Sequence, residues 1–354
     1  MNNNYCIIMA GGIGSRFWPW SREEEPKQFL DILGTGKSLI RQTFERFNVF
    51  IPSENIYVVT NKNYKTLVNE HLPELENSQI LCEPIMRNTA PCIAYASYKV
   101  LGLNENANIV VSPSDHVISN EHEFVARIKQ GLEHVKSDRI LTLGIKPSRP
   151  DTGYGYIEFG DKDSDNNIKP VNQFREKPSL EKAEEYLEQG NFVWNAGIFL
   201  WNVKSIIKSF ETHLPDIASV FETGFEDLNS DKEEDFIEIN FPKCENISID
   251  YGVMERSSNI DVLLCDFGWS DLGTWGSLYE KLDKDSNGNA ILGSNHFLRE
   301  CKNSIVKSNP DKKIVIQGLD NLIVIDTENT LLICAKNDEQ KIKALAKEMS
   351  QNEK

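Results

Sequence analysis

The sequence predicts an α/β fold in which helices cover both faces of a mostly parallel, mixed β-sheet. Short apolar runs recur through the first 145 residues, and stretches of helical length such as 90–103 and 121–136 separate them. The runs are apolar almost throughout, which is typical of strands buried on both faces. Ligands gather at the carboxyl ends of such strands, so the residues that follow each run are candidates for a functional site. The runs are 5–10, 55–60, 79–82, 108–112 and 139–144.

A glycine-rich, basic loop follows the first run. Its three glycines let the backbone turn sharply and present bare N–H groups to an anion. Arg16 adds a planar fork of donors and Lys27 adds a compact ammonium, which are two complementary ways to hold phosphate oxygens. The loop therefore predicts a triphosphate cradle. Its residues are Ala10, Gly11, Gly12, Gly14, Ser15, Arg16 and Lys27.

Two other phosphate-binding loops are excluded. The dinucleotide fingerprint needs a glycine where Phe17 stands, and prolines follow closely, so no long helix starts at this loop. Residues 34–38 imitate the end of a Walker A loop, but Asp31 occupies the place of its first glycine. We expect residues 34–38 to form a plain turn ahead of a helix at 39–50.

Seven further blocks follow the loop in order. They are 83–91 (EPIMRNTAP), 113–116 (PSDH), 144–147 (GIKP) with 152–156 (TGYGY), 174–178 (FREKP), 194–199 (WNAGIF), 248–251 (SIDY) and 269–275 (WSDLGTW). Together with the loop, they resemble the signature of the sugar-1-phosphate nucleotidyltransferases, specifically the bacterial mannose-1-phosphate guanylyltransferases. The resemblance implies a Rossmann-like catalytic domain over residues 1–283, with a sugar-binding lobe at about 145–260.

The segment 83–91 joins an apolar run to a helix. Read by itself, it is a capped helix start, with Asn88 or Thr89 as the cap ahead of a proline that suits a first turn. The resemblance places this segment along the nucleotide and assigns nucleotide contacts to Glu83, Asn88, Thr89 and Ser114. A carboxylate at Glu83 could accept hydrogen bonds from N1–H and the 2-amino group of guanine, which adenine could not satisfy.

Two aspartates lie where apolar runs end. Asp115 follows the run 108–112, and a hard carboxylate there suits Mg²⁺, which commonly bridges carboxylates and substrate phosphates. Asp271 follows the run 260–267 and is the natural second metal carboxylate, as the resemblance also implies. Read alone, Asp271 could equally cap a helix that begins near Leu272. Asp250 is interpreted as a charge at a helix N-terminus.

The pattern changes after residue 144. Alternating apolar residues on either side of a polar turn at 161–167 suggest antiparallel strands that form a lid or second lobe over the parallel sheet. A capped helix at 179–187 and a buried strand at 194–202 follow. The resemblance implies that this lobe binds the sugar, with Lys177 on the sugar phosphate. The assigned sugar-binding residues are Gly153, Tyr154, Glu176, Asn195 and Gly197.

The last part of the chain alternates again after a polar turn at 283–289. Four short, evenly spaced apolar runs precede a charged helix at 337–349. They predict a small β-domain over 290–354, which the resemblance implies is a short left-handed β-helix. No motif there carries chemistry, so we assign it to packing or to contact with a second copy of the chain.

Composition restricts the partners. A formal net charge of −16 argues against a binder of nucleic acid or of an anionic membrane, although a few local cations and a divalent metal can reverse the field inside one cleft. No run approaches the ~20 apolar residues that a membrane-spanning helix needs. The seven cysteines form no C-x-x-C pair and fit reduced core residues of a cytoplasmic protein.

The residues and the resemblance together lead to one expected reaction. The phosphate of mannose 1-phosphate would attack the α-phosphorus of GTP in line, giving GDP-mannose and pyrophosphate. Arg16, Lys27 and Lys177 are the expected charge-neutralising groups, and Mg²⁺ on Asp115 and Asp271 is the expected cofactor. The alternatives are a nucleotidyltransferase for a related sugar 1-phosphate and a non-catalytic regulatory subunit that binds a sugar nucleotide.

Overall fold

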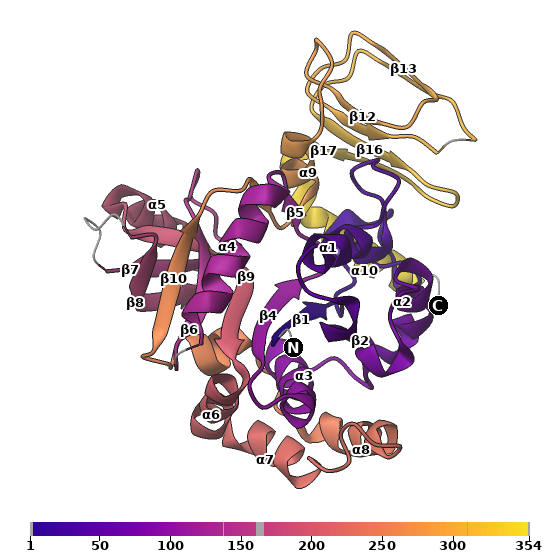
Figure 1. The fold of residues 1–354 in the computed structure, drawn as a ribbon. Helices are drawn as coiled ribbons and strands as arrows, with labels where there is room; N and C mark the ends of the chain where they lie inside the picture. The colour runs from indigo at the N-terminus through magenta and orange to yellow at the C-terminus, as the bar shows by residue number, and fades with distance from the viewer. Residues whose placement is uncertain (1–2, 137, 161–165, 310, 353–354) are drawn as a thin grey trace. The chain divides into compact units, whose positions relative to one another are not determined.

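The structure is a computed structural model that describes residues 3–136, 138–160, 166–309 and 311–352 (Figure 1). The chain divides into two compact units. Unit 1 comprises residues 1–11, 43–114 and 118–269, and unit 2 comprises residues 12–42, 115–117 and 270–354. Each unit is therefore built from separate stretches of the sequence.

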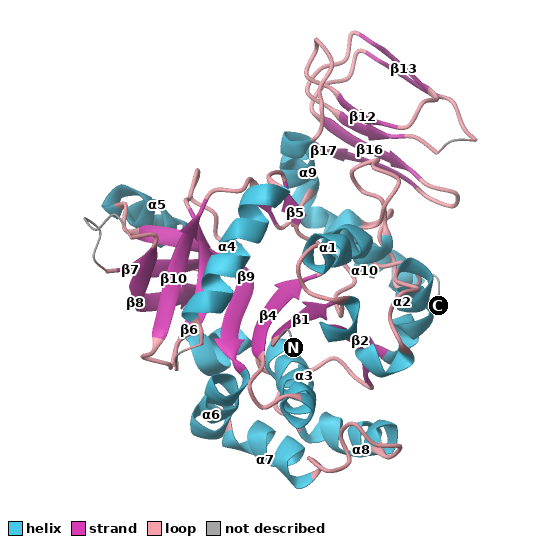
Figure 2. Ribbon diagram, viewed as in Figure 1, coloured by secondary structure: helices cyan, strands magenta, loops and turns pink. Residues whose placement is uncertain are grey.

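Unit 1 contains a nine-stranded mixed sheet of order β3-β2-β1-β4-β9-β6-β10-β8-β7 (Figure 2). β1, β2, β3 and β4 run parallel, as do β6 and β10, but β9 is antiparallel to both of its neighbours β4 and β6. The predicted mostly parallel, mixed sheet is thus confirmed. The strands are β1 (Asn4–Met9), β2 (Ile56–Asn61), β3 (Ile80–Glu83), β4 (Asn108–Pro113), β6 (Ile140–Ile145), β7 (Gly155–Phe159), β8 (Ile168–Glu176), β9 (Phe192–Asn202) and β10 (Ile260–Cys265).

Helices cover both faces of this sheet. On one face α3, α6 and α7 pack together, and α3 contacts β1 and β2; α4 packs against β4, β9 and β10. Along β1, Ile7 and Ile8 point to opposite faces, and both are fully buried. The helices of unit 1 are α2 (Lys65–His71), α3 (Thr89–Leu103), α4 (Glu121–His134), α5 (Leu180–Gln189), α6 (Val203–His213), α7 (Pro215–Thr223) and α8 (Glu233–Asn240).

The strands expected to form a lid belong instead to the main sheet. β7 pairs with β9 as well as with β8, and β8 pairs with β10, so both extend the sheet at its edge. The expected antiparallel pairing is confirmed, but the expectation of a lid over the sheet was wrong, because β9 continues from its pairing with β6 into a pairing with β7. Most of the predicted polar turn at 161–167 lies outside the described residues.

Unit 2 contains a β-rich region in which successive strands stack in parallel. β12 pairs with β14 and β14 with β16, while β13 pairs with β15, so each strand lies beside the one two places along the chain. Only β17 runs antiparallel, against β16, among the paired strands described in this region. The strands are β12 (Ala290–Leu292), β13 (His296–Arg299), β14 (Ile305–Lys307), β15 (Ile314–Gln317), β16 (Leu322–Asp326) and β17 (Leu331–Ala335).

Short elements complete unit 2. The glycine loop continues into a 3₁₀ turn η1 (Ser15–Phe17), and a second turn η2 (Lys27–Phe29) follows. Phe17, Trp275 and Ile342 are buried together with residues of the β-rich region in one apolar core. The helices are α9 (Trp275–Lys281) and α10 (Ile342–Asn352); the chain passes between units within α1 (Leu39–Asn48), β5 (Val117–Ile118) and β11 (Trp269–Ser270).

Three smaller predictions also have outcomes. Residues 34–38 form a turn, in which the Asp31 carboxylate accepts hydrogen bonds from the N–H groups of Thr35 and Gly36 at 2.9 and 2.6 Å. All seven cysteines are free. Within the described ranges, the helices are too short or too polar to cross a membrane.

Candidate active site

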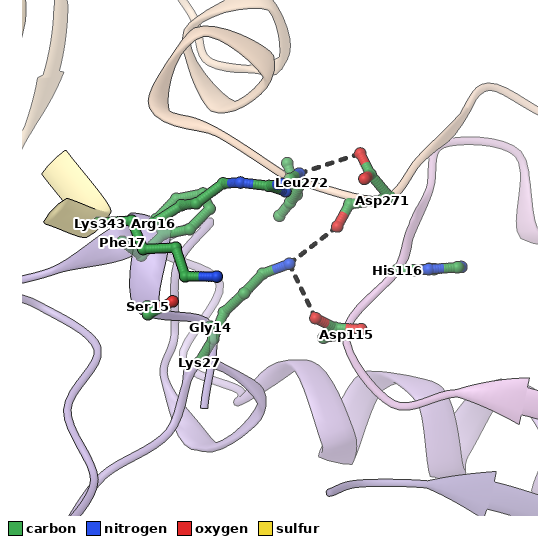
Figure 3. Close-up of a pocket in the computed structure, with 11 residues that line it drawn as sticks. Gly14, Ser15, Arg16, Phe17, Lys27, Asp115, His116, Asp271, Leu272 and Lys343 are labelled. Atoms are coloured by element: carbon green, nitrogen blue, oxygen red, sulfur yellow. Dashed lines mark hydrogen bonds and ion pairs between the residues drawn. The ribbon is translucent and has the colours of Figure 1, made fainter. Parts of the chain in front are cut away.

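The predicted triphosphate cradle lines a cavity of about 350 Å³ in unit 2 (Figure 3). Four stretches far apart in the sequence meet there: the glycine loop and the turn after it, the segment after β4, the segment after β11, and the start of α10. The lining residues are Gly14, Ser15, Arg16, Phe17, Lys27, Asp115, His116, Asp271, Leu272, Gly273 and Lys343. We call this cavity the phosphate pocket.

Lys27 is the central cation of the phosphate pocket. Its side chain is almost fully buried, and its Nζ donates to Asp115 Oδ2 at 2.9 Å and to the main-chain oxygen of Asp271 at 2.8 Å (Figure 3). The ammonium also lies 5.4 Å from the centre of the Phe17 ring. A buried ammonium is costly unless it is paired, so these contacts fix the position at which Lys27 presents its remaining proton to a ligand.

Gly14 is required by the same arrangement. Its backbone adopts a left-handed conformation with φ of 73°, and a Cβ there would lie 2.5 Å from the Lys27 Cβ. A side chain at this position would therefore displace Lys27 as well as strain the backbone. The glycine pattern that predicted an anion site has a second purpose, which is to let the Lys27 stem pass the loop.

The two predicted metal carboxylates both line the phosphate pocket. Burial alone would raise the pKa of Asp115, but the charges of Lys27 and His116 and the hydrogen bonds it accepts hold that pKa below its ordinary value. Asp271 Oδ1 accepts from the Gly273 N–H at 2.9 Å. Asp271 is not the cap of α9, because Thr274 accepts from the Ser277 N–H and is the N-cap.

These carboxylates fit Mg²⁺. The donors are carboxylate oxygens, and the lowered pKa keeps Asp115 ionised. Among the residues that the structure describes, no group of three or more His, Cys, Asp and Glu side chains forms a complete metal cage. Mg²⁺ does not need one, because it is usually bound by one or two carboxylates together with substrate phosphates and water.

The other predicted nucleotide residues belong to unit 1, except Gly12, at which unit 2 begins. Ala10 N–H donates to Val59 O at 2.8 Å, and Thr60 Oγ1 donates to Ala10 O at 2.9 Å, which extends the β1–β2 pairing to the start of the loop. A Cβ on Gly11 would lie 3.6 Å from Glu83 Oε2. Glu83, at the end of β3, therefore lies beside Gly11.

Glu83 is a buried carboxyl group in an apolar setting. Burial raises its pKa to about 8, against the opposing effect of a hydrogen bond with Cys92. Within the described part of the chain, Glu83 Oε1 is buried without a hydrogen-bond partner. An unsatisfied buried oxygen costs stability unless a ligand supplies a donor, so Glu83 has the character expected of a base-recognising group.

Asn88 and Thr89 have structural roles that the sequence could anticipate. Asn88 is the N-cap of α3 with φ of 66°, and its side chain accepts from the Thr89 N–H at 3.0 Å. Thr89 Oγ1 accepts from the Ile249 N–H at 2.9 Å. The capped helix start is confirmed, and the nucleotide contacts of both residues stay predictions.

Three of the residues predicted for the sugar site, Glu176, Lys177 and Asn195, lie close to one buried carboxyl group in unit 1, that of Asp250. Asn195 Nδ2 donates to Asp250 Oδ1 at 3.0 Å, while Asn195 Oδ1 accepts from the Gly197 N–H at 3.0 Å and from Thr142 Oγ1 at 3.1 Å. Three hydrogen bonds therefore fix the orientation of the Asn195 amide. We call the group formed by Glu176, Lys177, Asn195 and Asp250 the sugar cluster.

Asp250 is the member of the sugar cluster that sequence reasoning missed. It begins a π-helical turn (Asp250–Met254), as expected of a residue at a helix start. Burial is the main reason that the pKa of Asp250 is raised to about 7, and the charge of the nearby Glu176 carboxylate is the second. The expected position at a helix start is thus confirmed, but burial and the Glu176 charge, rather than the helix dipole, dominate the pKa of Asp250. No local pattern indicates the contact with Asn195, which lies 55 residues earlier.

Glu176 and Lys177 form an ion pair within the sugar cluster. Burial alone would lower the pKa of Lys177, but the hydrogen bond and charge of Glu176 raise it above its ordinary value. Gly155 also lies close to this cluster, since a Cβ on Gly155 would clash with Glu176 Oε2, and the role of Gly153 toward a sugar stays a prediction. Gly153 forms a turn in which its N–H donates to Asp151.

The remaining predicted residues lie beside these groups. Tyr154 packs edge-on against Trp194 and Trp269, with ring centres 5.0 and 5.3 Å apart. Ser114 is buried and its N–H donates to Met9 O at 3.0 Å, next to the end of β1. Gly12 is exposed, and a Cβ there would meet open space, so the described residues give no steric reason for a glycine at that position.

Comparison with known proteins agrees with these features. A family model described as Nucleotidyl transferase matches residues 5–288, and one described as MannoseP isomerase/GMP-like beta-helix domain matches residues 294–349. A mannose-1-phosphate guanylyltransferase of Escherichia coli is 36% identical over 352 residues, which cover 97% of this chain and 75% of that protein. One from Sinorhizobium fredii is 36% identical over 354 residues, covering 98% and 68%.

A solved structure is also similar over almost the whole chain. It is described as a mannose-1-phosphate geranyltransferase from Thermus thermophilus, and it superposes with a TM-score of 0.89 at 28% identity. The similarity covers 99% of this chain and 100% of that one. The fold of both units therefore has a counterpart in one experimentally determined protein.

Proposed function

The chain belongs to the nucleotidyl transferase family and, within it, to the mannose-1-phosphate guanylyltransferases, and from this premise we propose that it makes GDP-mannose and pyrophosphate from GTP and α-D-mannose 1-phosphate. A phosphate oxygen of the sugar phosphate bonds to the α-phosphorus of GTP. The bond between that phosphorus and the oxygen bridging to the β-phosphorus breaks, and both its electrons leave with pyrophosphate. The nucleophile is already an anion, so no protein group has to remove a proton.

The observation that carries the proposal is the charge arrangement of the phosphate pocket. In a chain with a net charge of −16, Lys27 is buried and held in place by Asp115 and the Asp271 carbonyl, and Arg16 lines the same cavity. Fixed cations beside a developing anion lower the barrier without reorganisation. Arg16 and Lys27, with the amides of the loop, would bind the β- and γ-phosphates and stabilise them as they depart.

Glu83 would select the base. Its unpartnered buried oxygen supports this role, because a carboxylate there can accept from both N1–H and the 2-amino group of guanine. Adenine offers no donor at its N1, so it would leave a buried acceptor unsatisfied, which costs about 1–3 kcal/mol.

The sugar cluster would hold mannose 1-phosphate. Lys177 would neutralise the attacking phosphate, and the carboxyl and amide groups of Glu176, Asn195 and Asp250 would bond sugar hydroxyls. These groups suit a neutral, hydroxyl-rich ligand because they offer both donors and acceptors. Binding energy from the sugar then orients the phosphate for attack.

Asp115 and Asp271 would hold Mg²⁺. When bound, this ion would draw charge from the phosphates and help to orient them. The protein's own part is to keep Asp115 ionised, which the Lys27 and His116 charges do. Lys27 and the metal would share the Asp115 carboxylate, so the position of Lys27 would affect metal binding as well as phosphate binding.

We place the protein in the cytoplasm, because seven free cysteines suit a reducing compartment and GTP and sugar phosphates are abundant there. The catalytic domain over 1–283 and the β-domain over 290–354 are proposed as separate domains. The family models over 5–288 and 294–349 support that division.

A pyrophosphate-release assay tests the function. GTP with mannose 1-phosphate should release pyrophosphate at a rate well above that with ATP or UTP, and above that with GTP and glucose 1-phosphate. Preference for another sugar phosphate would identify a nucleotidyltransferase of different specificity. A folded protein that binds GDP-mannose but releases no pyrophosphate with any pair would be a regulatory subunit.

A further inference from the structure

A lysine from the end of the chain lines the phosphate pocket. Lys343 lies in the first turn of α10, more than 300 positions after the glycine loop, and its side chain reaches the same cavity as Arg16 and Lys27 (Figure 3). α10 packs against η1, the turn that carries Arg16. Ile342, the residue before it, is fully buried in the apolar core of unit 2. The main chain at Lys343 is therefore anchored by its neighbour, while the Lys343 side chain itself is exposed.

Within residues 3–136, 138–160, 166–309 and 311–352, neither Lys343 nor Arg16 has an ion pair. Both side chains are exposed, as are other lysines of unit 2 without a salt bridge among the described residues, such as Lys302 and Lys313, so the missing ion pair alone does not indicate a ligand. The shared cavity is the distinguishing feature, because Lys343 and Arg16 line it together with the buried Lys27. Three cations thus stand against the two carboxylates of Asp115 and Asp271, which favours an anion in the cavity.

We propose that Lys343 is a substrate-contacting residue that binds the pyrophosphate portion of the nucleotide, that is, the β- and γ-phosphates that leave. This inference rests on the function proposed above. Lys343 shares the phosphate pocket with Arg16 and the loop residues Gly14 and Ser15, which form the triphosphate cradle. Its chemistry is a point charge for a dianionic or trianionic phosphate group. The β-rich end of unit 2 thereby contributes to the pocket through α10 as well as to packing.

Calorimetric titration with magnesium pyrophosphate tests the proposal on the full-length chain. Lys343→Ala should weaken binding roughly tenfold, as expected for the loss of one charge-assisted hydrogen bond, and Lys343→Glu should weaken it further. Lys343→Arg should stay near wild type. Lys347→Ala is the matched control, because it removes the same charge one helical turn along α10 at a residue outside the cavity lining.

Steady-state kinetics give a second readout. Lys343→Ala should raise KM for GTP, and for pyrophosphate in the reverse direction, while KM for mannose 1-phosphate stays unchanged. Circular dichroism and the melting temperature establish that each variant is folded. Wild-type pyrophosphate affinity in both Lys343→Ala and Lys343→Glu would overturn the proposal, as would an equal loss in Lys347→Ala, which would indicate a general charge effect.

The outcome separates this inference from the proposed function. If the wild type forms GDP-mannose and the Lys343 variants bind pyrophosphate normally, the function stands and the role of Lys343 fails. The opposite outcome is that the wild type forms no GDP-mannose, while Lys343→Ala and Lys343→Glu, but not Lys347→Ala, bind pyrophosphate more weakly than the wild type. The anion site then stands and the proposed function fails.

Discussion

Asp115 in the phosphate pocket and Asp250 in the sugar cluster are the same residue type with opposite pKa shifts. Burial acts on both in the same direction, raising the pKa. Asp115 faces the Lys27 ammonium and His116, which bring its pKa below the ordinary value, whereas Asp250 faces the Glu176 carboxylate, and its pKa rises to about 7. The neighbouring charge decides which form each carboxyl group takes.

This difference matches the two kinds of ligand proposed. An ionised carboxylate beside a buried ammonium suits a metal and highly charged phosphates. A carboxyl group that holds its proton near neutral pH can donate a hydrogen bond as well as accept one, which suits a sugar hydroxyl. The phosphate pocket is thus organised by charge and the sugar cluster by hydrogen bonding.

The largest expected effect is the loss of the central cation. Lys27→Ala should lower kcat by ~10²-fold or more, the effect typical of losing a transition-state charge partner. It should also change the Mg²⁺ concentration that gives half-maximal rate, because Asp115 loses its ion-pair partner. Lys37→Ala, at an exposed lysine of the turn after Asp31, should behave like wild type. Normal turnover in a folded Lys27→Ala protein would refute the charge-based pocket.

The second prediction concerns the metal. Asp271→Asn should raise the Mg²⁺ concentration needed for half-maximal rate on the order of tenfold or more, because a neutral amide is a weaker ligand for a hard cation. A magnesium titration at saturating GTP measures it. Asp283→Asn, at an exposed aspartate of unit 2, is the control. An unchanged titration would contradict the assignment of Asp271 as a metal ligand.

The third prediction concerns base recognition. Because the pKa of Glu83 is raised to about 8, the free protein holds it mostly protonated at pH 7. The ionised form accepts both guanine donors, so KM for GTP should fall as pH rises from 7 to 9. Glu83→Gln should lose this pH dependence and raise KM for GTP about tenfold. The control Glu70→Gln should keep both properties; a pH-independent KM in the wild type would contradict this role.

The smallest expected effect concerns stability and the sugar cluster. The pKa of Asp250 is raised from 3.8 to about 7 in the folded protein, so its contribution to stability is fully present below pH about 4 and is lost as pH rises through 7. Asp250→Asn removes this loss, while the Asn195 amide can still donate to the new carboxamide oxygen.

Melting temperatures at pH 5 and pH 8 check this expectation. The melting temperature of Asp250→Asn, relative to that of the wild type, should be a few degrees higher at pH 8 than at pH 5. Each kcal/mol of stability corresponds to ~2 °C. Asp266→Asn, at an exposed aspartate of unit 1, should show no such change. Equal differences at both pH values would mean that Asp250 is ionised in the folded protein and that the contrast with Asp115 is lost.

Much of the fold and of the phosphate pocket was predictable from local pattern. The apolar runs became strands β1 to β4 and β6. The candidate metal ligands Asp115 and Asp271, each placed after an apolar run, line one cavity with Arg16 and Lys27. Ser179 and Gly190 delimit α5 as expected, with Ser179 accepting from the Lys182 N–H and Gly190 left-handed. Such signals are local because strand burial, capping and left-handed turns each depend on a few adjacent residues.

Other features had no local signal. The pairing of β7 with β9 joins residues distant in sequence, such as Ile157 and Val193, and so local pattern suggested a lid or second lobe instead. Lys343 looks like any lysine of a charged helix, and Asp250 looks like a helix-start aspartate. Their roles follow from what lies opposite them, Arg16 and Lys27 in one case and Glu176 and Asn195 in the other.

The amino-acid sequence by itself determined the order of strands and helices, the glycine loop and the residue types that can bind a phosphate or a metal, because each is encoded within a few neighbouring positions. Only the tertiary structure decided which aspartate is ionised, which glycine admits a side chain and which distant lysine enters the cavity. The physical reason is that a pKa, a steric limit and a charge balance are properties of the groups that surround a residue in space.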